Sequence, residues 1–432
     1  MIKRIKSKFQ SQDSKKISAN FMYLSILQGM NLLLPLITFP YLVRVLGIEK
    51  FGLIMFAQAF IVYFSMLADY GFNLSGIREV SSNRNNKNKL IKIFSSIMIA
   101  RFVLVLIGLI FLTIVVFSFE KFSQNWELYY LTFGIVIGTA LFPTWFFQGM
   151  EKMKYITVLT VIAKLIFTLS IFIFVTDKND YIYVPLINSL GFIFVGLISL
   201  YIIFKDFNMK FEFQKFKRIK LQFIKGWNIF VSKISINLYG ATNTFILGIF
   251  TTDAIVGYYA IAEKVVRIIC SIFAPFYQAI YPHVVGIVKK PKNEASVFLK
   301  RVFNYSLAIS SVVFLFSIFL GEFLFLLVFE EEAINSINIF YILSPLIIII
   351  PMASLFFNVI LLSYKLDKYF SKLYILGGII NLLLIFILFQ FLEEKVIAVS
   401  ISLLITESII TLGAFLVILN KQIMTFRRIE KK

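Results

Sequence analysis

The stretch FVLVLIGLIFLTIVVFSF, residues Phe102–Phe119, runs for eighteen residues without a charged side chain. A helix rises about 1.5 Å per residue, so this stretch alone nearly matches the hydrocarbon thickness of a bilayer. Apolar runs of similar length recur along the chain between clusters of charged and turn-forming residues. We expect twelve membrane spans, at Ser18–Leu46, Phe51–Leu74, Leu90–Phe119, Glu127–Gln148, Tyr155–Val175, Tyr181–Phe204, Leu221–Phe250, Ala254–Val285, Val302–Phe329, Ala333–Ser363, Phe370–Phe391 and Val396–Asn420.

The composition of the whole chain agrees with this pattern. Its 432 residues are 59% hydrophobic and 15% charged, whereas soluble domains are about 25% charged. A mean hydropathy of +0.87 excludes a soluble enzyme, a disordered protein and a nucleic-acid-binding module. The sequence contains one cysteine, Cys270, and one histidine, His283, which leaves no His/Cys metal site. We therefore predict an all-α polytopic membrane protein without a metal or a cofactor.

Basic residues between the expected spans lie almost entirely in alternate loops. With the N-terminus placed in the cytoplasm, the inner loops and tails carry 32 Lys and Arg residues, and the outer loops carry four. The outer loops also carry eleven acidic residues. Because cytoplasmic loops are enriched in Lys and Arg, both termini are predicted to be cytoplasmic. The same rule explains the net charge of +20 without a nucleic-acid partner.

A short internal repeat divides the expected spans into two sets of six. Residues 51–58, FGLIMFAQ, resemble residues 256–263, VGYYAIAE, and both stretches begin a span at the outer side. Because six is an even number, two such sets have the same orientation and are related by an axis along the membrane normal. We predict two six-helix lobes around a central cavity, residues 1–210 and residues 211–432.

Ionisable side chains inside the spans are mostly basic. Such groups are costly at this depth and usually face a bundle interior or a water-filled cavity. The positive excess favours an anionic substrate with several oxygens, such as a diphosphate. Structural pairing with buried acids is the alternative for the cations near the midplane, and Lys225 is expected to snorkel to the interface. The candidate substrate-binding cations are Arg44, Arg101, Lys164, Lys233, Lys264 and Arg267.

Polar side chains form stripes along three of the spans. Such stripes either line a cavity or make hydrogen bonds between helices. The candidates for lining the cavity are Gln28, Asn31, Gln58, Asn228 and Ser232. Four acidic residues also fall within the spans, at Asp69, Glu263, Glu322 and Glu407. Glu263 and Arg267 are one helical turn apart, so they are expected to neutralise each other in part.

Three motifs in the N-terminal half are distinctive in their order and spacing. They are PYLVRVLGIEKFG at residues 40–52, DYGFNLSGIRE at residues 69–79 and PTWFFQGMEKM at residues 143–153. Together they resemble the Wzx-type O-antigen and polysaccharide flippases of the multidrug/oligosaccharidyl-lipid/polysaccharide exporter superfamily. Peptidoglycan-precursor flippases have fourteen spans, whereas twelve are expected here. A peptidoglycan precursor is therefore a less favoured substrate. The resemblance implies that five residues within the matching motifs are functional: Arg44, Asp69, Arg78, Gln148 and Glu151.

The resemblance implies a flippase of the bacterial cytoplasmic (inner) membrane. It would move a polyprenyl-diphosphate-linked oligosaccharide, an O-antigen or capsule repeat unit, by opening its cavity alternately to each side. The resemblance also implies contact with membrane lipids and with polysaccharide polymerase or chain-length proteins. A multidrug or ion antiporter of the same superfamily, and a membrane glycosyltransferase or polymerase, remain alternatives. The flippase itself would not be an enzyme.

Energy coupling has its own candidates, because no ATP-hydrolysing domain interrupts the spans. Coupling to H⁺ or Na⁺ requires a titrating or ion-binding group within the membrane. Glu407 is the expected titrating group, since it has no basic neighbour on its own helix, and Asp69 is expected to pair with Arg78. The full set of coupling or gate candidates is Asp69, Arg78, Gln148, Glu151, Glu263 and Glu407.

Overall fold

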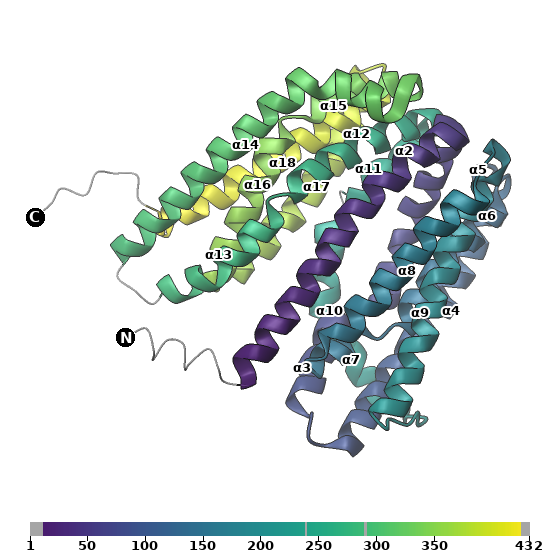
Figure 1. The fold of residues 1–432 in the computed structure, drawn as a ribbon, viewed down its shortest axis with the longest axis vertical. Helices are drawn as coiled ribbons and strands as arrows, with labels where there is room; N and C mark the ends of the chain where they lie inside the picture. Colours follow the sequence, from purple (N-terminus) through teal and green to yellow (C-terminus); the bar gives the residue numbers. More distant parts are fainter. Residues whose placement is uncertain (1–11, 238–239, 289–291, 425–432) are drawn as a thin grey trace, which may run out of the picture. The chain divides into compact units, whose positions relative to one another are not determined.

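A computed structural model describes residues 12–237, 240–288 and 292–424, which form helices joined by short connections, with no β-strand among them (Figure 1). Eight of the described helical segments are long and apolar enough to cross a membrane by length and composition. This confirms the expected all-helical membrane fold. Other expected spans are divided into shorter helices, so the count of twelve stays a prediction.

The described chain separates into two compact units. The N-terminal unit comprises the chain up to Leu46 and Ala57–Ile234, and the C-terminal unit comprises Gly47–Phe56 and the chain from Ser235 onward. The expected lobes, 1–210 and 211–432, stay a prediction. The N-terminal unit contains most of α2 and then α3 (Phe72–Ser82), α4 (Lys87–Ser118), α5 (Glu120–Ser123), α6 (Trp126–Leu141), α7 (Thr144–Gly149), α8 (Met153–Phe174), the 3₁₀ helix η1 (Lys178–Ile182), α9 (Tyr183–Asp206) and the larger part of α10 (Phe216–Asn237).

The C-terminal unit is built from a second series of helices. They begin at α11 and include a 3₁₀ turn, η2, and a π-helical segment, η3, that continues α16. The series is α11 (Gly240–Phe250), α12 (Asp253–Ser271), α13 (Ala274–Ile287), α14 (Lys292–Phe329), η2 (Glu330–Ala333), α15 (Ile334–Leu343), α16 (Leu346–Ser354), η3 (Leu355–Leu361), α17 (Asp367–Phe391) and α18 (Lys395–Asn420).

The long helix α2 (Gln12–Asp69) is interrupted at Gly47, where φ is 75° and ψ is 164°. This backbone conformation is open essentially to glycine alone. The interruption falls between the first and second expected spans, at the outer loop that the charge pattern predicts. Glycine in the first motif is therefore required by the backbone turn that ends one span and begins the next.

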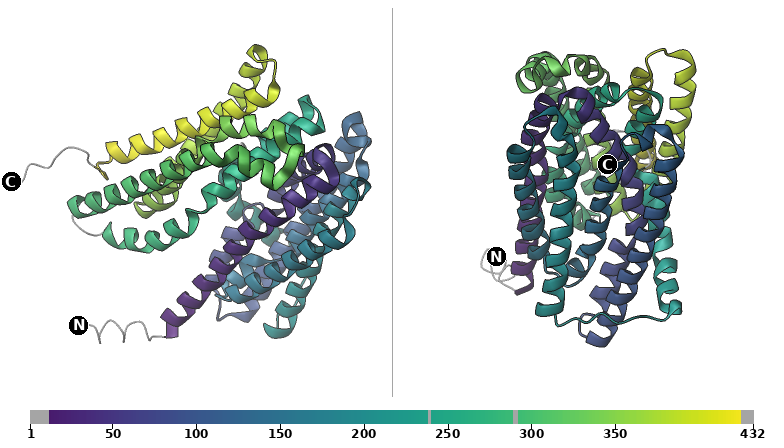
Figure 2. Two further views of the ribbon diagram at one scale, coloured as in Figure 1. Left: turned by 45° about the horizontal axis from the view of Figure 1, so that its top comes forward. Right: turned by 90° about the vertical axis from the view of Figure 1, so that its right-hand side faces the viewer.

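Small residues bring α6 and α9, two of the blue-to-teal helices of the N-terminal unit (Figure 2), into close contact. Gly134 and Gly138 lie one helical turn apart on α6, a spacing that lets helix backbones approach in membranes. A Cβ atom at Gly138 would lie 2.5 Å from the carbonyl carbon of Phe192. The Ser189 hydroxyl on α9 donates to the carbonyl oxygen of Leu131. Helix contact here depends on the absence of side chains rather than on their interdigitation.

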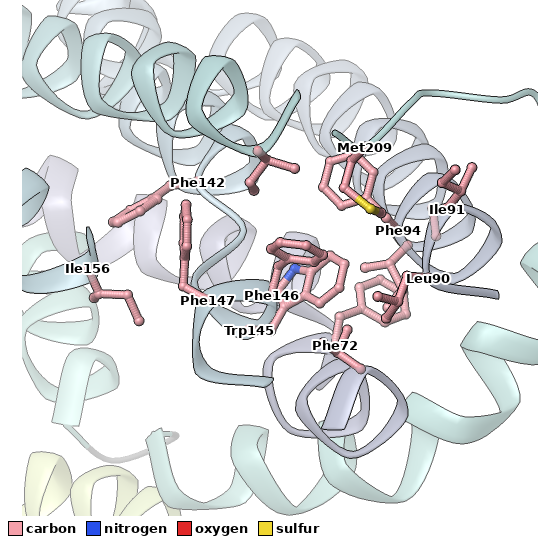
Figure 3. Close-up of a cluster of buried hydrophobic side chains, with 14 of the residues drawn as sticks. Phe72, Leu90, Ile91, Phe94, Phe142, Trp145, Phe146, Phe147, Ile156 and Met209 are labelled. Carbon is pink, nitrogen blue, oxygen red and sulfur yellow. The ribbon is translucent and has the colours of Figure 1, made fainter. Parts of the chain in front are cut away.

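Aromatic rings fill the core at one end of the N-terminal unit (Figure 3). Trp145 on α7 is fully buried, with its ring centroid 6.0 Å from that of Phe94 and 6.2 Å from that of Phe146. A Cβ atom at Gly76 on α3 would lie 2.8 Å from Cε3 of Trp145. The second and third motifs therefore meet in this core, which explains the glycine and the tryptophan in them.

The two segments of the internal repeat pack against each other within the C-terminal unit. A Cβ atom at Gly52 would lie 1.8 Å from the carbonyl oxygen of Asp253 and 2.7 Å from the amide nitrogen of Gly257. A Cβ atom at Gly257 would lie 2.5 Å from the carbonyl oxygen of Ile48. The glycines that the repeat places at equivalent positions thus permit one close backbone contact.

The orientation in the membrane is open to direct measurement. We expect a cysteine replacing Glu331 to react from outside with an impermeant thiol reagent, because acidic residues concentrate in the outer loops. A cysteine replacing Lys217, in a basic inner loop, should react only after the membrane is opened. Labelling of the Lys217→Cys variant from outside intact cells would contradict the predicted orientation.

Candidate functional site

Arg101 on α4 is the most completely buried of the candidate cations that the structure describes. The residue is 3% exposed, and its Nη2 lies 3.0 Å from Oδ1 of Asp69 and 3.1 Å from Oδ1 of Asn73. Its Nη1 donates to the carbonyl oxygen of Thr139 at 3.4 Å. A guanidinium without water needs such partners. This geometry makes Arg101 part of a structural ion pair at the end of α2.

This pair corrects one expectation from the sequence. Asp69 was expected to pair with Arg78, nine residues along the chain, but it pairs with Arg101 from another helix. Arg78 is exposed on α3 and makes no ion pair within the described part of the chain. The Thr144 hydroxyl also contacts Oδ1 of Asn73, at 3.3 Å. Asn73 lies inside the second motif but was not among the predicted site residues.

The third motif makes a second ion pair near the same end of the unit. Nη1 of Arg84 lies 2.7 Å from Oε1 of Glu151, and Nε of Arg84 donates to the carbonyl oxygen of Gly149. Gln148 is half-buried beside them. Arg84 was not singled out in the sequence, because it looked like one more basic residue of an inner loop. The contacts give Glu151 a role in holding α3 against α7.

Lys225 on α10 differs from its expected role. Instead of snorkelling, its Nζ contacts Oε1 of Glu79 on α3. Nε2 of Gln222 donates to the other carboxylate oxygen of Glu79 at 2.9 Å. Gln222 is buried. Both oxygens of the Glu79 carboxylate thus contact side chains of α10, and these contacts hold α10 against α3. Glu79 lies in the second motif, which again has a structural role.

Lys164 on α8 contrasts with these paired groups. It is half-buried, lies near the middle of its helix and makes no ion pair with a described residue. Two contacts fix the register of α8 against α2, since Oγ1 of Thr157 donates to the Tyr23 carbonyl at 2.9 Å and the Tyr41 hydroxyl donates to the Val175 carbonyl at 2.8 Å. Both contacts join residues 134 positions apart.

The same register places Lys164 level with residue 30 of α2. Thr157 and Val175 lie two and three helical turns from Lys164, so all three share the side of α8 that faces α2. Gln28 and Asn31, which were expected to line a cavity, flank residue 30 and are exposed. The structure thus brings Lys164, Gln28 and Asn31 to one level of the N-terminal unit. A cationic side chain at this level can bind an anion.

A charged cluster in the C-terminal unit lies on α12 and α18. Oε1 of Glu263 accepts from both Nε and Nη2 of Arg267, each at 2.8 Å, which confirms the expected pair on one helix face. Glu407 on α18 is close enough to act on the charge of Arg267. Lys264 also feels the charges of Glu263 and Arg267. Two acids therefore balance two bases in this cluster.

Glu407 consequently has the basic neighbour that its own helix lacks. No basic residue near Glu407 lies on α18 itself, and the neighbour is Arg267 on α12. The Tyr259 ring is buried one turn before Glu263, and its hydroxyl accepts from Nδ2 of Asn243 at 3.4 Å. Arg267 keeps 43% of its side chain exposed. A charged group that is both paired and exposed can exchange partners.

The remaining candidates are placed less closely. Arg44 is exposed near the end of the first part of α2, and Gln58 is half-buried in the second part. The side chains of Asn228, Ser232 and Lys233 lie outside the described residues. The structure therefore neither joins these five residues to Lys164 nor separates them from it.

The family assignment follows from comparison with known proteins. A family model described as polysaccharide biosynthesis protein matches residues 17–288. The chain belongs to this family. A protein from Escherichia coli K12, named “Putative O-antigen transporter”, is 29% identical over 405 residues, which cover 94% of this chain and 97% of the relative. A Shigella dysenteriae protein of the same name is 27% identical over 396 residues and covers 91% and 98% of the two chains.

Solved structures show that this member of the polysaccharide biosynthesis family shares a fold with known transporters. The lipid II flippase MurJ, in an inward closed conformation, aligns over 94% of this chain and 89% of its own with a TM-score of 0.71 at 12% identity. An inward-facing multidrug resistance transporter of the MATE family and MOP superfamily aligns over 93% and 98%, with a TM-score of 0.67 at 14% identity. The resemblance found in the three motifs is confirmed, and the chain is a multi-pass membrane protein.

Proposed function

We propose that this protein is a flippase for a polyprenyl-diphosphate-linked oligosaccharide. It would move an O-antigen or related repeat unit across the bacterial cytoplasmic membrane by alternating access. Family membership places the chain in polysaccharide biosynthesis, and two relatives matched over nearly their whole length are named O-antigen transporters. The fold is that of transporters. No covalent step is part of the proposal.

One observation in the structure supports the choice of an anionic substrate. Lys164 lies near the middle of α8 without an acidic partner among the described residues. Arg101, Lys225 and Arg267 are all neutralised by carboxylates. Ionisable groups at this depth are costly, so an unneutralised one usually serves a pathway. A diphosphate passing Lys164 would supply the missing negative charge.

Deletion of the gene in its host tests the proposed substrate class. Cells without the protein should accumulate a lipid-linked repeat unit on the cytoplasmic side and lose the finished glycan at the surface. Restoring the gene should reverse both changes. Normal surface glycan, with no accumulated intermediate, would contradict the flippase proposal. A drug or ion antiporter would instead change resistance to toxic cations or to salt.

Substitution of Lys164 tests the binding role directly. We expect Lys164→Ala to lower transport by about tenfold or more, because a hydrogen bond to a charged group contributes about 1.5–3 kcal/mol. The amount of folded protein in the membrane should stay normal. Lys164→Arg should retain activity, and Lys154→Ala, an exposed lysine at the start of the same helix, should behave as wild type. Parallel loss of protein and activity in Lys164→Ala would make Lys164 structural.

The charged cluster of the C-terminal unit supports a proposal about coupling. Glu263 and Glu407 both act on Arg267, so protonation of either carboxylate would leave the positive charge of Arg267 less completely balanced. Ionisable residues within a membrane commonly mark proton or ion pathways, and a charge balance that depends on protonation supports an H⁺-coupled step. A Na⁺-coupled step would use the same carboxylates as ligands. Such a coupling site is also the feature that would favour an antiporter of the same superfamily.

We expect Glu407→Gln to transport without responding to an imposed ion gradient. The amide cannot change charge, so the balance around Arg267 would no longer depend on the ion. Transport by purified protein in liposomes, with and without a pH or Na⁺ gradient, measures this. Glu322→Gln serves as the matched control, because Glu322 is exposed on α14. A Glu407→Gln variant that still responds to the gradient removes Glu407 from the coupling step.

A further inference from the structure

The segment Phe207–Lys220, between α9 and the first turn of α10, has two sides of different character. One side is fixed to the N-terminal unit. The Phe207 ring lies 5.3 Å from that of Phe146, centroid to centroid, and Met209 is buried in the aromatic core. The backbone N–H of Glu212 donates to Oγ of Ser95 on α4 at 3.0 Å. These contacts hold the segment at the level of Ser95 on α4.

The other side of the segment carries exposed aromatic rings among basic residues. Phe213 is 93% exposed and Phe216 is 77% exposed. Soluble protein surfaces rarely leave two such rings in water. Between Phe207 and Lys220 there are five basic residues and one acid, Glu212. All five basic residues are exposed, at Lys210, Lys215, Lys217, Arg218 and Lys220.

Neighbouring residues place the segment at the depth of the lipid headgroups. Nζ of Lys205, in the last turn of α9, lies 3.0 Å from the hydroxyl of Tyr201 and 5.3 Å from its ring centroid. Tyrosine and lysine at a helix end mark the membrane–water boundary. Ser95 follows Lys92, after which α4 carries no charge until Arg101. The segment therefore runs where charged helix ends give way to apolar spans.

We propose that Phe207–Lys220 is a binding surface for anionic phospholipids of the membrane in which the protein lies. Phe213 and Phe216 enter the boundary between headgroups and acyl chains, and the basic residues contact the phosphates. Aromatic side chains among Lys and Arg are the composition that binds such surfaces. A lipid fits better than a protein partner, because the segment directly follows α9, which is long and apolar enough to cross a membrane. The proposal does not depend on which substrate the protein transports.

A fluorophore at position 213 tests the proposal. Phe213→Cys in a Cys270→Ala background, labelled with an environment-sensitive dye, would be placed in nanodiscs of phosphatidylcholine with or without phosphatidylglycerol. Asn85→Cys is the matched control, since Asn85 lies in the exposed turn between α3 and α4. If Cys270→Ala fails to fold, the wild-type Cys270 background replaces it, because that thiol is buried.

We expect the dye at position 213 to emit at shorter wavelength than at position 85. It should lose quenching by aqueous iodide and gain quenching by spin-labelled lipid, and both changes should grow with phosphatidylglycerol. Replacing Lys215, Lys217 and Arg218 with glutamine should remove the dependence on phosphatidylglycerol. Full iodide quenching at position 213 in both lipids would overturn the proposal. Protection that appears only on adding a cytoplasmic extract would also overturn it, in favour of a protein partner.

Discussion

Replacing Asp69 with alanine is expected to remove most of the folded protein from the membrane. The change leaves the Arg101 guanidinium 3% exposed and without its carboxylate. Removing one partner of a buried ion pair costs about 3–5 kcal/mol. Proteins are stable by only about 5–15 kcal/mol in total, so this loss is a large fraction of the margin. Asn73 alone would remain as a side-chain partner for Nη2.

Fluorescence-detected gel filtration and thermal unfolding in detergent measure the effect. Joint replacement by apolar residues, Asp69→Leu with Arg101→Met, should recover part of the stability, because neither charge is then left buried. Arg78→Ala is the control, since Arg78 is exposed and makes no ion pair with a described residue. If Asp69→Ala and Arg101→Ala both fold normally but fail to transport, the pair belongs to the transport pathway instead.

Gly138→Leu is expected to separate α6 from α9 and to destabilise the N-terminal unit. Even a Cβ atom at Gly138 would lie 2.5 Å from the carbonyl carbon of Phe192 and 2.6 Å from the amide nitrogen of Ile193. Both are backbone atoms and cannot rotate away. Overpacking of this kind costs about 1–3 kcal/mol or more, and a leucine adds three further carbons. Gly138→Ala should show a smaller loss in the same direction.

A glycine on the facing helix, α9, provides a control whose substitution should not lower the stability. A Cβ atom at Gly191 on α9 would meet only the carbonyl oxygen of Ala163, at 4.0 Å. Gly191→Ala should therefore be neutral or stabilise by about 0.5–1 kcal/mol, through helix propensity alone. Midpoints of thermal unfolding in one detergent give the comparison. Equal midpoints for Gly138→Leu and Gly191→Ala would show that α6 and α9 are not closely packed.

Local sequence signals predicted the parts of the fold that depend on neighbouring residues. The apolar runs predicted the helices, and the break at Gly47 falls in a predicted loop. Glu263 and Arg267 were predicted as a pair because four residues make one helical turn. The four-residue spacing of Gly134 and Gly138 is a helix-packing signal that the sequence itself contains. The exact number of spans depends on whether the shorter helices also cross the membrane.

Pairings between helices were beyond the sequence, because they depend on the register of one helix against another. Asp69 meets Arg101 rather than Arg78, and Glu407 acts on Arg267 from a different helix. The depth of Lys164 could be counted along α8, but its level on α2 required the contacts of Thr157 and Tyr41. Asp69 and Glu151, two motif residues expected to act in transport, make ion pairs within the N-terminal unit.

Translocation by the purified protein tests the central claim most directly. Liposomes would contain a polyprenyl-diphosphate oligosaccharide with a fluorophore on its glycan, and a membrane-impermeant reductant would report the fraction on the outer leaflet. We expect rapid exchange between leaflets with wild-type protein and with Lys154→Ala, and slow exchange with Lys164→Ala. Exchange in wild-type proteoliposomes no faster than in protein-free liposomes would contradict the account.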